Sequence, residues 1–298
     1  MNKLPFQQVA VLMGGPSEER EVSLRSGRAI ADGLRRAGYA VREVDVINHA
    51  FSLPPGCDAA FVALHGEFGE DGQVQDLLTR RGIPFPGARA RASRQAFDKV
   101  CAKHILMKNG ISTPAFEVVR RGQPRVLPLP VFVKPVRQGS SFGCHKVAAE
   151  ADWPAALADA LSYNGEAVVE RFIDGRELTV GFVDDEVLPV IEIRAPGNTY
   201  DYRAKYTQGL TEYRVPAPLT AEDAARCQAL ARAAYRALEG RGLGRVDLRM
   251  DAAGGLFVLE LNTIPGFTET SLLPKAAQAA GYSFPALCDR ILRAAVAL

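Results

Sequence analysis

Residues 244–268 read GRVDLRMDAAGGLFVLELNTIPGFT. Two strand-like runs, 244–250, in which apolar and polar residues alternate, and the largely apolar 256–261, flank the turn sequence DAAGG. Such runs around a glycine-containing turn predict a β-hairpin. Because successive side chains of a strand point to opposite faces, the hairpin should present its polar residues together on one surface.

Four of these polar residues form the strongest candidate site in the chain. Arg245 and Asp247 lie two positions apart on the first strand, and Glu260 and Asn262 lie two apart on the second. Three hard oxygen donors without His or Cys suit Mg²⁺, above all where phosphate oxygens complete an octahedron. A solvated charged sheet face would show the same residues. The Pro-Gly pair at 265–266 favours the ligand site, because it marks backbone that approaches a ligand.

The first ninety residues alternate between strand and helix patterns. Strands separated by helices indicate parallel pairing with right-handed crossovers, and ligands collect beyond the carboxyl ends of such strands. Two glycine-rich stretches follow there, GGPSEEREVS at 14–23 and HGEFGEDG at 65–72. The expected strands are 8–13, 41–46 and 59–64, and the expected helices are 22–37 and 74–79.

The alternation breaks at the sequence PFPG, residues 84–87, which predicts a first domain boundary. Residues 195–210 are polar and rich in Tyr, Gly and Asp, which predicts a surface loop. Helices are expected at 92–109, 153–162, 221–238, 270–280 and 285–297, and further strands at 130–134, 145–148, 168–172, 178–183 and 186–193.

A second candidate site is the glycine- and serine-rich stretch KPVRQGSSFG at 134–143. A hairpin tip of this kind offers backbone N–H groups and hydroxyls to a polyphosphate, and a lysine in the strand supplies a point charge. The chain has no GxxxxGK[ST] string, so this is not a P-loop. A plain hairpin without a ligand is the alternative.

Several single residues allow two interpretations. Glu18 and Glu19 begin a helix, where carboxylates favour the dipole; that explanation suffices for Glu18, whereas Glu19 could also bind a substrate ammonium. His65 could be a structural histidine, and Lys205 and Tyr206 could be ordinary surface residues. The GxGxxG fingerprint is absent, which argues against a dinucleotide-dependent oxidoreductase.

The composition excludes several classes of protein. The 298 residues are 47% apolar and 23% charged, which excludes a disordered chain. With 36 Lys plus Arg against 34 Asp plus Glu, charge gives no reason to expect a nucleic acid or an anionic membrane as partner. No apolar run approaches the roughly 18–20 residues of a membrane span, and we expect no signal peptide. Five scattered cysteines without a CxxC pair predict reduced thiols in a cytoplasmic protein.

Taken together, six strings resemble the D-alanine–D-alanine ligases of the ATP-grasp superfamily, in that family's order and spacing. They are GGPSEEREVSL, HGEFGEDG, KPVRQGSSFG, YDYRAKY, GRVDLRMD and LELNTIPGFTETSLLP. The resemblance implies an α/β chain in which a small parallel-sheet domain (1–88, substrate-binding) precedes an ATP-grasp fold. That fold would comprise a central lid domain (89–172) and a mixed-sheet catalytic domain (173–298).

The activity implied by the resemblance is ATP-dependent ligation of two D-alanines through a D-alanyl phosphate, for peptidoglycan precursor synthesis. Two Mg²⁺ ions would be held by Asp247, Glu260 and Asn262, with Glu260 shared between them and Mn²⁺ able to substitute. The implied partners are D-alanine, ATP and a second copy of the chain in a homodimer. The nucleotide-binding residues implied by the family are Lys99, Lys134, Ser141, Glu170, Arg171, Ile173, Glu177 and Lys205.

The resemblance also implies roles at the reacting atoms. Arg245 and the Gly266 N–H would stabilise the oxyanion, and Lys205 would reach the γ-phosphate. Glu19, Ser140 and Tyr206 would form a hydrogen-bonded trio that closes a loop over the site, and Ser271 would hold the second D-alanine's carboxylate. The implied substrate-binding residues are Glu19, Val22, His65, Lys205, Tyr206, Arg245, Asn262, Gly266, Ser271 and Leu272, and the implied catalytic ones are Glu19, Ser140, Tyr206, Arg245, Gly266 and Ser271.

Some residues depart from the family pattern, and two alternatives stay open. FPGARARAS at 85–93 replaces a common Tyr-Thr-Gly-Ser run, and Arg171-Phe172 stands where Lys-Trp is frequent. One alternative is a ligase for D-Ala–D-Lac or D-Ala–D-Ser, although Tyr206 argues against D-lactate because related D-lactate enzymes often carry Phe there. The other alternative is a non-catalytic nucleotide-binding relative.

Overall fold

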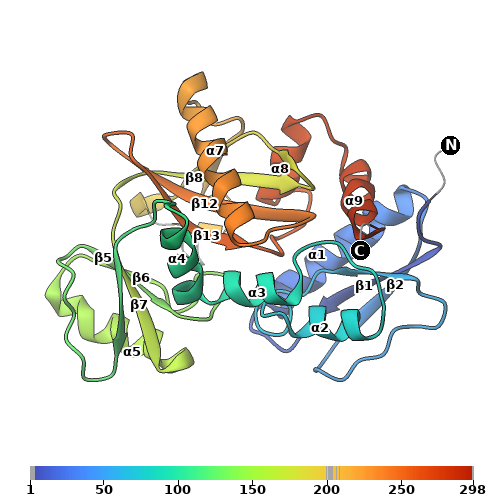
Figure 1. The fold of residues 1–298 in the computed structure, drawn as a ribbon, viewed down its shortest axis with the longest axis horizontal. Helices are drawn as coiled ribbons and strands as arrows, with labels where there is room; N and C mark the ends of the chain where they lie inside the picture. Colours follow the sequence, from blue (N-terminus) through green and yellow to red (C-terminus); the bar gives the residue numbers. More distant parts are fainter. Residues whose placement is uncertain (1–3, 199, 201–203, 206, 208, 297–298) are drawn as a thin grey trace.

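The computed structural model describes residues 4–198, 200, 204–205, 207 and 209–296. Figure 1 shows three sheets that divide the chain in sequence order, with helices packed against each. The β2-β1-β3 sheet lies at one end and the β4-β7-β5-β6 sheet at the other, and the β8-β12-β13 region lies between and above them. This arrangement leaves the central sheet in contact with both ends of the molecule.

The N-terminal sheet is parallel, as the sequence predicts. Strand β1 (Gln8–Gly14) lies between β2 (Ala40–Val46) and β3 (Ala59–Val62). Helix α1 (Arg20–Arg36) crosses over β1, and α2 (Gln73–Arg80) follows the second glycine-rich stretch. Both glycine-rich stretches therefore leave the same edge of this sheet, as expected for the carboxyl ends of parallel strands.

The antiparallel sheet at the opposite end has the order β4-β7-β5-β6, and we call it the lid sheet. The expected pairing of β5 with β6 is confirmed. Strand β4 was not predicted from the sequence; it is an edge strand with a single fully buried side chain, so its burial gives little alternation. The elements are β4 (Phe116–Arg120), β5 (Val131–Pro135), β6 (His145–Val147), a 3₁₀ turn (Glu150–Asp152), α5 (Trp153–Asn164) and β7 (Glu166–Arg171).

The third sheet contains the predicted hairpin, formed by β12 and β13. The expected single strand over 186–193 is wrong: it is two short strands, because Pro189 lacks the N–H that a continuous ladder needs. The strands of this third sheet are β8 (Gly175–Val183), β9 (Glu186–Val187), β10 (Ile191–Arg194), β11 (Glu212–Arg214), β12 (Leu243–Asp251) and β13 (Leu256–Asn262). The accompanying helices are α7 (Ala221–Ala237), α8 (Leu272–Ala279) and α9 (Phe284–Arg293), with 3₁₀ turns at Pro196–Asn198 and Ala294–Val296.

The single helix expected over 92–109 is also two helices, α3 (Ala90–Phe97) and α4 (Lys99–Lys108). Asp98 between them has an extended backbone, and its side chain accepts a hydrogen bond from Cys101 N at 2.9 Å. An Asp in this position caps the helix that follows it. The break places Lys99 at the first position of α4, beside the loop between β5 and β6.

The hydrophobic core consists of separate clusters. One cluster joins the N-terminal sheet to α8 and α9, and contains Val11 and Leu273. Another joins α4 to the central sheet through Leu106 and Val180, although the predicted boundary at residue 89 assigns α4 to the lid domain. The lid sheet and α5 form a small cluster of their own. The lid sheet therefore shares little core with the rest of the molecule.

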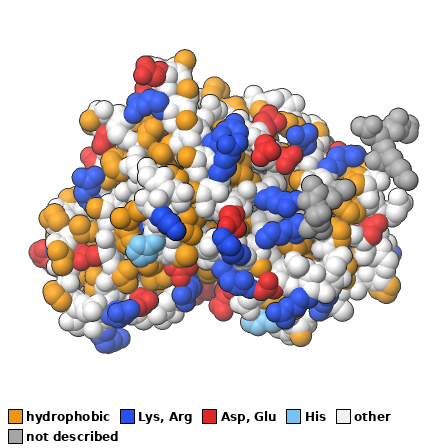
Figure 2. All heavy atoms as spheres, in the orientation of Figure 1, with side chains coloured by type: hydrophobic (Ala, Val, Ile, Leu, Met, Phe, Trp, Pro, Cys, Tyr) orange, Lys and Arg blue, Asp and Glu red, His pale blue; other side chains and the backbone are white. Residues whose placement is uncertain are grey.

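Two surface properties bear on function. Over the described residues, no helix combines the length and the apolar composition needed to cross a membrane. Figure 2 shows Lys and Arg side chains interspersed with Asp and Glu on the face presented, including near its centre. This mixture agrees with the nearly balanced composition.

Candidate active site

Two adjoining cavities lie around the β12–β13 hairpin. The first, here called the lid cavity, lies between the lid sheet and the central sheet, and Lys134 and Glu260 line it. The second, here called the loop cavity, is lined by both N-terminal glycine-rich stretches and by the chain after β13, including Glu19 and Gly266. The two cavities adjoin, because six residues line both: Glu70, Gly139, Ser140, Tyr200, Lys205 and Asn262.

Each predicted site residue lines one or both of these cavities, except Tyr206, which lies outside the described residues. The lid cavity is lined by Lys99, Lys134, Ser140, Ser141, Glu170, Arg171, Ile173, Glu177, Lys205, Asp247, Glu260 and Asn262. The loop cavity is lined by Glu19, Val22, His65, Ser140, Lys205, Arg245, Asn262, Gly266, Ser271 and Leu272.

The hairpin register brings its four polar residues together. Arg245 pairs with Asn262 across the strands, and Asp247 pairs with Glu260. Both Asp247 oxygens are engaged: Arg245 donates Nε and Nη2 at 2.8 Å each, and Asn262 donates Nδ2 at 3.0 Å. Thr179 on β8 donates to the same carboxylate at 2.6 Å. Although burial acts to raise it, Arg245 holds the pKa of Asp247 below its ordinary value.

The hairpin also supplies the donors for a divalent cation. Asp247 and Glu260 offer carboxylate oxygens, and Asn262 offers an amide oxygen. Within the described part of the chain, no three His, Cys, Asp or Glu side chains group closely enough to hold a metal by themselves. This oxygen-only set therefore fits Mg²⁺ bound together with phosphate oxygens, which is how Mg²⁺ is usually held at phosphate-transfer sites.

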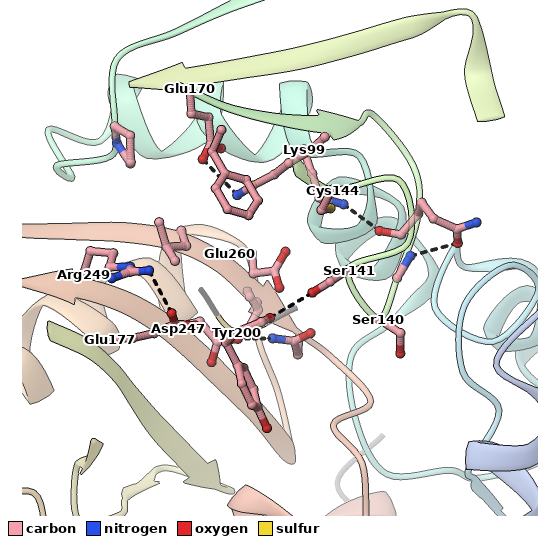
Figure 3. A pocket seen from close by; sticks show the side chains of 18 of the residues that line it. Lys99, Ser140, Ser141, Cys144, Glu170, Glu177, Tyr200, Asp247, Arg249 and Glu260 are labelled. Atoms are coloured by element: carbon pink, nitrogen blue, oxygen red, sulfur yellow. Dashed lines mark hydrogen bonds and ion pairs between the residues drawn. The ribbon is translucent and has the colours of Figure 1, made fainter. Parts of the chain in front are cut away.

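On the lid side, Glu170 lies between two lysines. Its Oε2 atom is 2.8 Å from Lys134 Nζ and its Oε1 atom is 2.9 Å from Lys103 Nζ. All three side chains are almost completely buried. Burial alone would raise the pKa of Glu170, but the two ammonium groups lower it to about 2. Figure 3 shows Glu170 on the lid side of the cavity, opposite Glu260 and Asp247 on the central sheet.

The far end of the lid cavity contains a second buried ion pair that the sequence analysis did not identify. Arg249 Nη2 is 3.0 Å from Glu177 Oε2, and these residues are direct partners between β12 and β8. Arg249 also lies over the Phe172 ring, 5.4 Å from its centre. Alternation carried two positions beyond Asp247 would have placed Arg249 on the polar face of the strand.

The loop between β5 and β6 closes onto the N-terminal domain through Glu19. Ser140 donates a hydrogen bond to Glu19 Oε1, and Ser141 donates to the backbone oxygen of Tyr200 at 3.3 Å. Within the described residues, the buried Oε2 atom of Glu19 has no hydrogen-bond partner. The Glu19 side chain makes no capping hydrogen bond to α1, so helix capping does not explain why this carboxylate is buried here. Burial raises the pKa of Glu19.

The β5–β6 loop approaches the Glu19 carboxylate so closely that position 139 requires glycine. A methyl group at Gly139 would collide with the Glu19 carboxylate. We expect Gly139→Ala to lower kcat by about a hundredfold, because misplacement of a closing loop by about an ångström has effects of that size. Isothermal titration with Mg·ATP should show nearly unchanged affinity. Normal turnover by this variant would contradict the assigned role of the loop.

Glu70 and His65 form the wall behind Glu19. Glu70 accepts a hydrogen bond from Gly66 N at 2.7 Å, and burial together with the nearby Glu19 raises its pKa to about 8. Burial lowers the pKa of His65 to about 4, so His65 is neutral at pH 7. Glu70 was not predicted from the sequence, although the string HGEFGEDG contains it. Its signal was an acid next to a glycine, within the stretch that follows a strand end.

Tyr200 also lines both cavities and was not predicted. Its hydroxyl is 2.9 Å from that of Tyr213 on β11. The Lys205 ammonium lies 5.2 Å from the centre of the Tyr200 ring, a cation–π contact. Figure 3 shows Tyr200 below Ser141, with a dashed line between the two. Tyr200 therefore links the β5–β6 loop to the residue proposed to face the γ-phosphate.

The far end of the loop cavity lies at the start of α8. Ser271 precedes the first helical residue, Leu272, and its Oγ accepts a hydrogen bond from Thr268 N at 3.0 Å. Lys275, one turn into the helix, lines the same cavity. Free N–H groups of a helix start and a nearby ammonium favour a carboxylate. The loop cavity thus has an acid at one end and, at the other, a helix start and a lysine that suit a carboxylate.

Comparisons with known proteins agree with this geometry. The profile described as D-ala D-ala ligase C-terminus matches residues 104–293. The chain is 45% identical over 292 residues to the D-alanine–D-alanine ligase of Methylacidiphilum infernorum, covering 98% of this chain and 96% of that protein. It is 47% identical over 298 residues to that of Syntrophotalea carbinolica, with coverages of 98% and 97%.

A solved structure is similar over the same length. The crystal structure of a D-alanine–D-alanine ligase from Bacillus anthracis matches with a TM-score of 0.85 at 33% identity, covering 97% of each chain. This likeness confirms the α/β fold expected from the sequence, in which a small parallel-sheet domain precedes the two-sheet ATP-grasp region.

Proposed function

The chain belongs to the D-alanine–D-alanine ligase family, and on that premise we propose that it joins two D-alanines with ATP. The observation that carries the proposal is that the two cavities share lining residues. Lys205 and Asn262 line both, so a phosphate in the lid cavity lies next to an amino acid in the loop cavity. Such an arrangement suits transfer of a phosphoryl group to a substrate carboxylate.

In the first step, the first D-alanine carboxylate attacks the γ-phosphorus of ATP. A new oxygen–phosphorus bond forms, the bond to the β-phosphate oxygen breaks, and ADP leaves with that electron pair. Glu19 holds the substrate ammonium through its unpartnered Oε2. Lys99, Lys134 and Lys205 neutralise the negative charge of the phosphates, which is the main way proteins accelerate phosphoryl transfer.

In the second step, the amine of the second D-alanine attacks the acyl carbon of D-alanyl phosphate. The carbon–nitrogen bond forms, the amine loses a proton, and inorganic phosphate leaves. Arg245 and the Gly266 N–H stabilise the oxyanion that forms in between. Ser271 and the Leu272 N–H hold the second substrate's carboxylate at the start of α8.

The remaining site residues hold the nucleotide and its cation. Ile173 and the backbone of Glu170 and Arg171 contact the adenine, and Glu177 binds the ribose. Asp247, Glu260 and Asn262 would hold two Mg²⁺ ions, which would supply positive charge to neutralise the phosphate oxygens. Arg245 restrains Asp247 in the orientation for this role, because the two side chains share a bidentate pair.

Water would hydrolyse the acyl phosphate, so the site must close during the reaction. Ser140 joins the β5–β6 loop to Glu19, and Ser141 joins it to Tyr200. Val22 and the neutral His65 complete the wall of the loop cavity. Tyr206 is proposed to be the third member of the group formed with Glu19 and Ser140.

The direct test is phosphate release from Mg·ATP with D-alanine, with L-alanine, or with D-alanine plus D-lactate. Mass spectrometry identifies the products. We expect phosphate and D-alanyl-D-alanine only when the D-isomer is present. A D-alanyl-D-lactate product would favour the depsipeptide alternative. Nucleotide binding without phosphate release in any mixture would favour a non-catalytic relative.

Several expectations from the sequence remain proposals. Those that the resemblance implies are substitution of Mn²⁺ for Mg²⁺, a homodimer, and the three domains bounded at residues 88 and 172; the cysteine usage predicts a cytoplasmic location. The sheet boundaries support the last of them, because β7 ends at Arg171 in the lid sheet and β8 begins at Gly175 in the central sheet.

A further inference from the structure

Lys103 is a buried lysine that lines neither cavity. It lies on α4, and 1% of its surface is exposed. Its ammonium contacts Glu170 Oε1 at 2.9 Å and donates to Thr113 Oγ1 at 2.8 Å. The Phe116 ring centre lies 5.3 Å away. Burial of a lysine is costly unless a partner compensates, so its presence here requires an explanation.

The partner of Lys103 is itself part of the lid cavity. Glu170 uses its other oxygen, Oε2, to contact Lys134 Nζ at 2.8 Å. Lys134 and Glu170 line the cavity, whereas Lys103 lies behind them. The three side chains therefore form a row that runs from the interior of the protein to the cavity, with the carboxylate in the middle.

The charges of this row decide how Lys134 can act. With both ammonium groups protonated and Glu170 ionised, the row carries a net charge of +1 next to the cavity. Without Lys103, Glu170 and Lys134 would form a neutral buried pair. A phosphate would then have to compete with a carboxylate for the same ammonium in a medium of low dielectric constant.

We propose that Lys103 is a positioning residue for nucleotide phosphate binding: it neutralises Glu170 from behind, so that Lys134 stays available to the phosphates. The proposal rests on the proposed function, because it requires ATP in the lid cavity. Helix α4 carries Lys103 four residues after Lys99, hence on the same face. One helix therefore places one lysine at the cavity and another behind Glu170.

Substitution of Lys103 by methionine tests the proposal. Calorimetry should show the affinity for Mg·ATP falling about tenfold to a hundredfold, the size expected when one charge-assisted contact is lost. The affinity for adenosine should hardly change, because adenosine has no phosphate, and the KM for D-alanine should also be kept. Burial lowers the pKa of Lys103, so Lys103→Arg, which keeps a permanent charge, should retain most of the ATP affinity.

A double variant distinguishes the effect of the lost charge from an effect on folding. In Lys103→Met combined with Glu170→Gln, the row again has a net charge of +1 and Lys134 has no carboxylate partner. We expect this double variant to bind Mg·ATP more tightly than Lys103→Met does, with the ratio of ATP affinity to adenosine affinity returning toward that of the wild type. Leu106→Ala, one turn away on the same helix and fully buried, serves as the control for lost stability. It should lower the melting temperature without changing the preference for ATP over adenosine.

The possible outcomes separate the two proposals. If wild-type protein does not bind Mg·ATP, the proposed function fails. If wild-type protein binds Mg·ATP and Lys103→Met binds it equally well, only the role of Lys103 is overturned. Equal losses of ATP and adenosine affinity, matching those of Leu106→Ala, would likewise overturn it, since they would show a structural effect alone. Failure of the double variant to regain affinity would contradict the charge argument.

Discussion

Replacement of Glu260 by alanine is expected to abolish ligation, lowering kcat by about a thousandfold or more, since metal-assisted charge stabilisation contributes several kcal/mol. Glu260 faces Asp247 directly across the hairpin and lines the lid cavity opposite Glu170. It is the carboxylate proposed to be shared by both Mg²⁺ ions. Its removal would therefore weaken the binding of both ions.

The measurement is steady-state phosphate release over a range of Mg²⁺ concentrations, together with Mg·ATP binding by calorimetry. Glu260→Gln keeps the size of the side chain and removes its charge, so it should be nearly as inactive as the alanine variant. Glu239→Ala is the matched control, because Glu239 is exposed and its side chain forms a surface ion pair with Arg91. Activity of Glu260→Ala close to that of Glu239→Ala would remove the basis of the metal assignment.

The hairpin was predictable from sequence because two independent patterns agree there. Alternation along 244–250 and the glycine-containing turn predict the hairpin, but they do not predict its register. The pairing shifts between Asp247 and Leu248, and this irregularity sets Asp247 opposite Glu260. The same reasoning failed over 92–109, where a continuous apolar pattern concealed the break at Asp98. A helix cap is a local hydrogen bond that leaves the hydrophobic period intact, so periodicity alone did not reveal it.

The site residues that sequence analysis missed have a common physical cause. Lys103, Glu70 and Tyr200 take their roles from tertiary contacts: an ion pair with Glu170, the proximity of Glu19, and a hydrogen bond to Tyr213. None of these partners is adjacent in sequence. Arg249 differs, because the alternation along β12 already placed it beside Asp247.

The second large effect is expected for Glu19→Gln, which should lower kcat/KM for D-alanine by about a hundredfold to a thousandfold, as for removal of one partner of a buried charged pair. Glu19 is buried, its Oε1 accepts from Ser140, and its Oε2 has no partner among the described residues. A substrate ammonium would satisfy that oxygen. Steady-state kinetics with varied D-alanine provide the measurement, and Mg·ATP affinity should be unchanged.

Two further variants distinguish ammonium binding from loop closure, because Glu19 contributes to both. Ser140→Ala removes the hydrogen bond between the loop and Glu19 but leaves the Glu19 carboxylate in place, so it should reduce kcat while preserving the KM for the first D-alanine. Glu18→Gln is the matched control, since Glu18 contacts Gln138 only weakly, at 3.5 Å.

The pH dependence gives an independent check. Burial raises the pKa of Glu19, so Glu19 is protonated at a higher pH than an exposed carboxylate would be. As the pH is lowered, D-alanine binding should therefore begin to weaken at that higher pH. The Glu19→Gln variant should lose this pH dependence. If Ser140→Ala and Glu19→Gln had identical effects on KM and kcat, Glu19 would act only as a loop anchor. The unpartnered Oε2 would then need an explanation other than the ammonium.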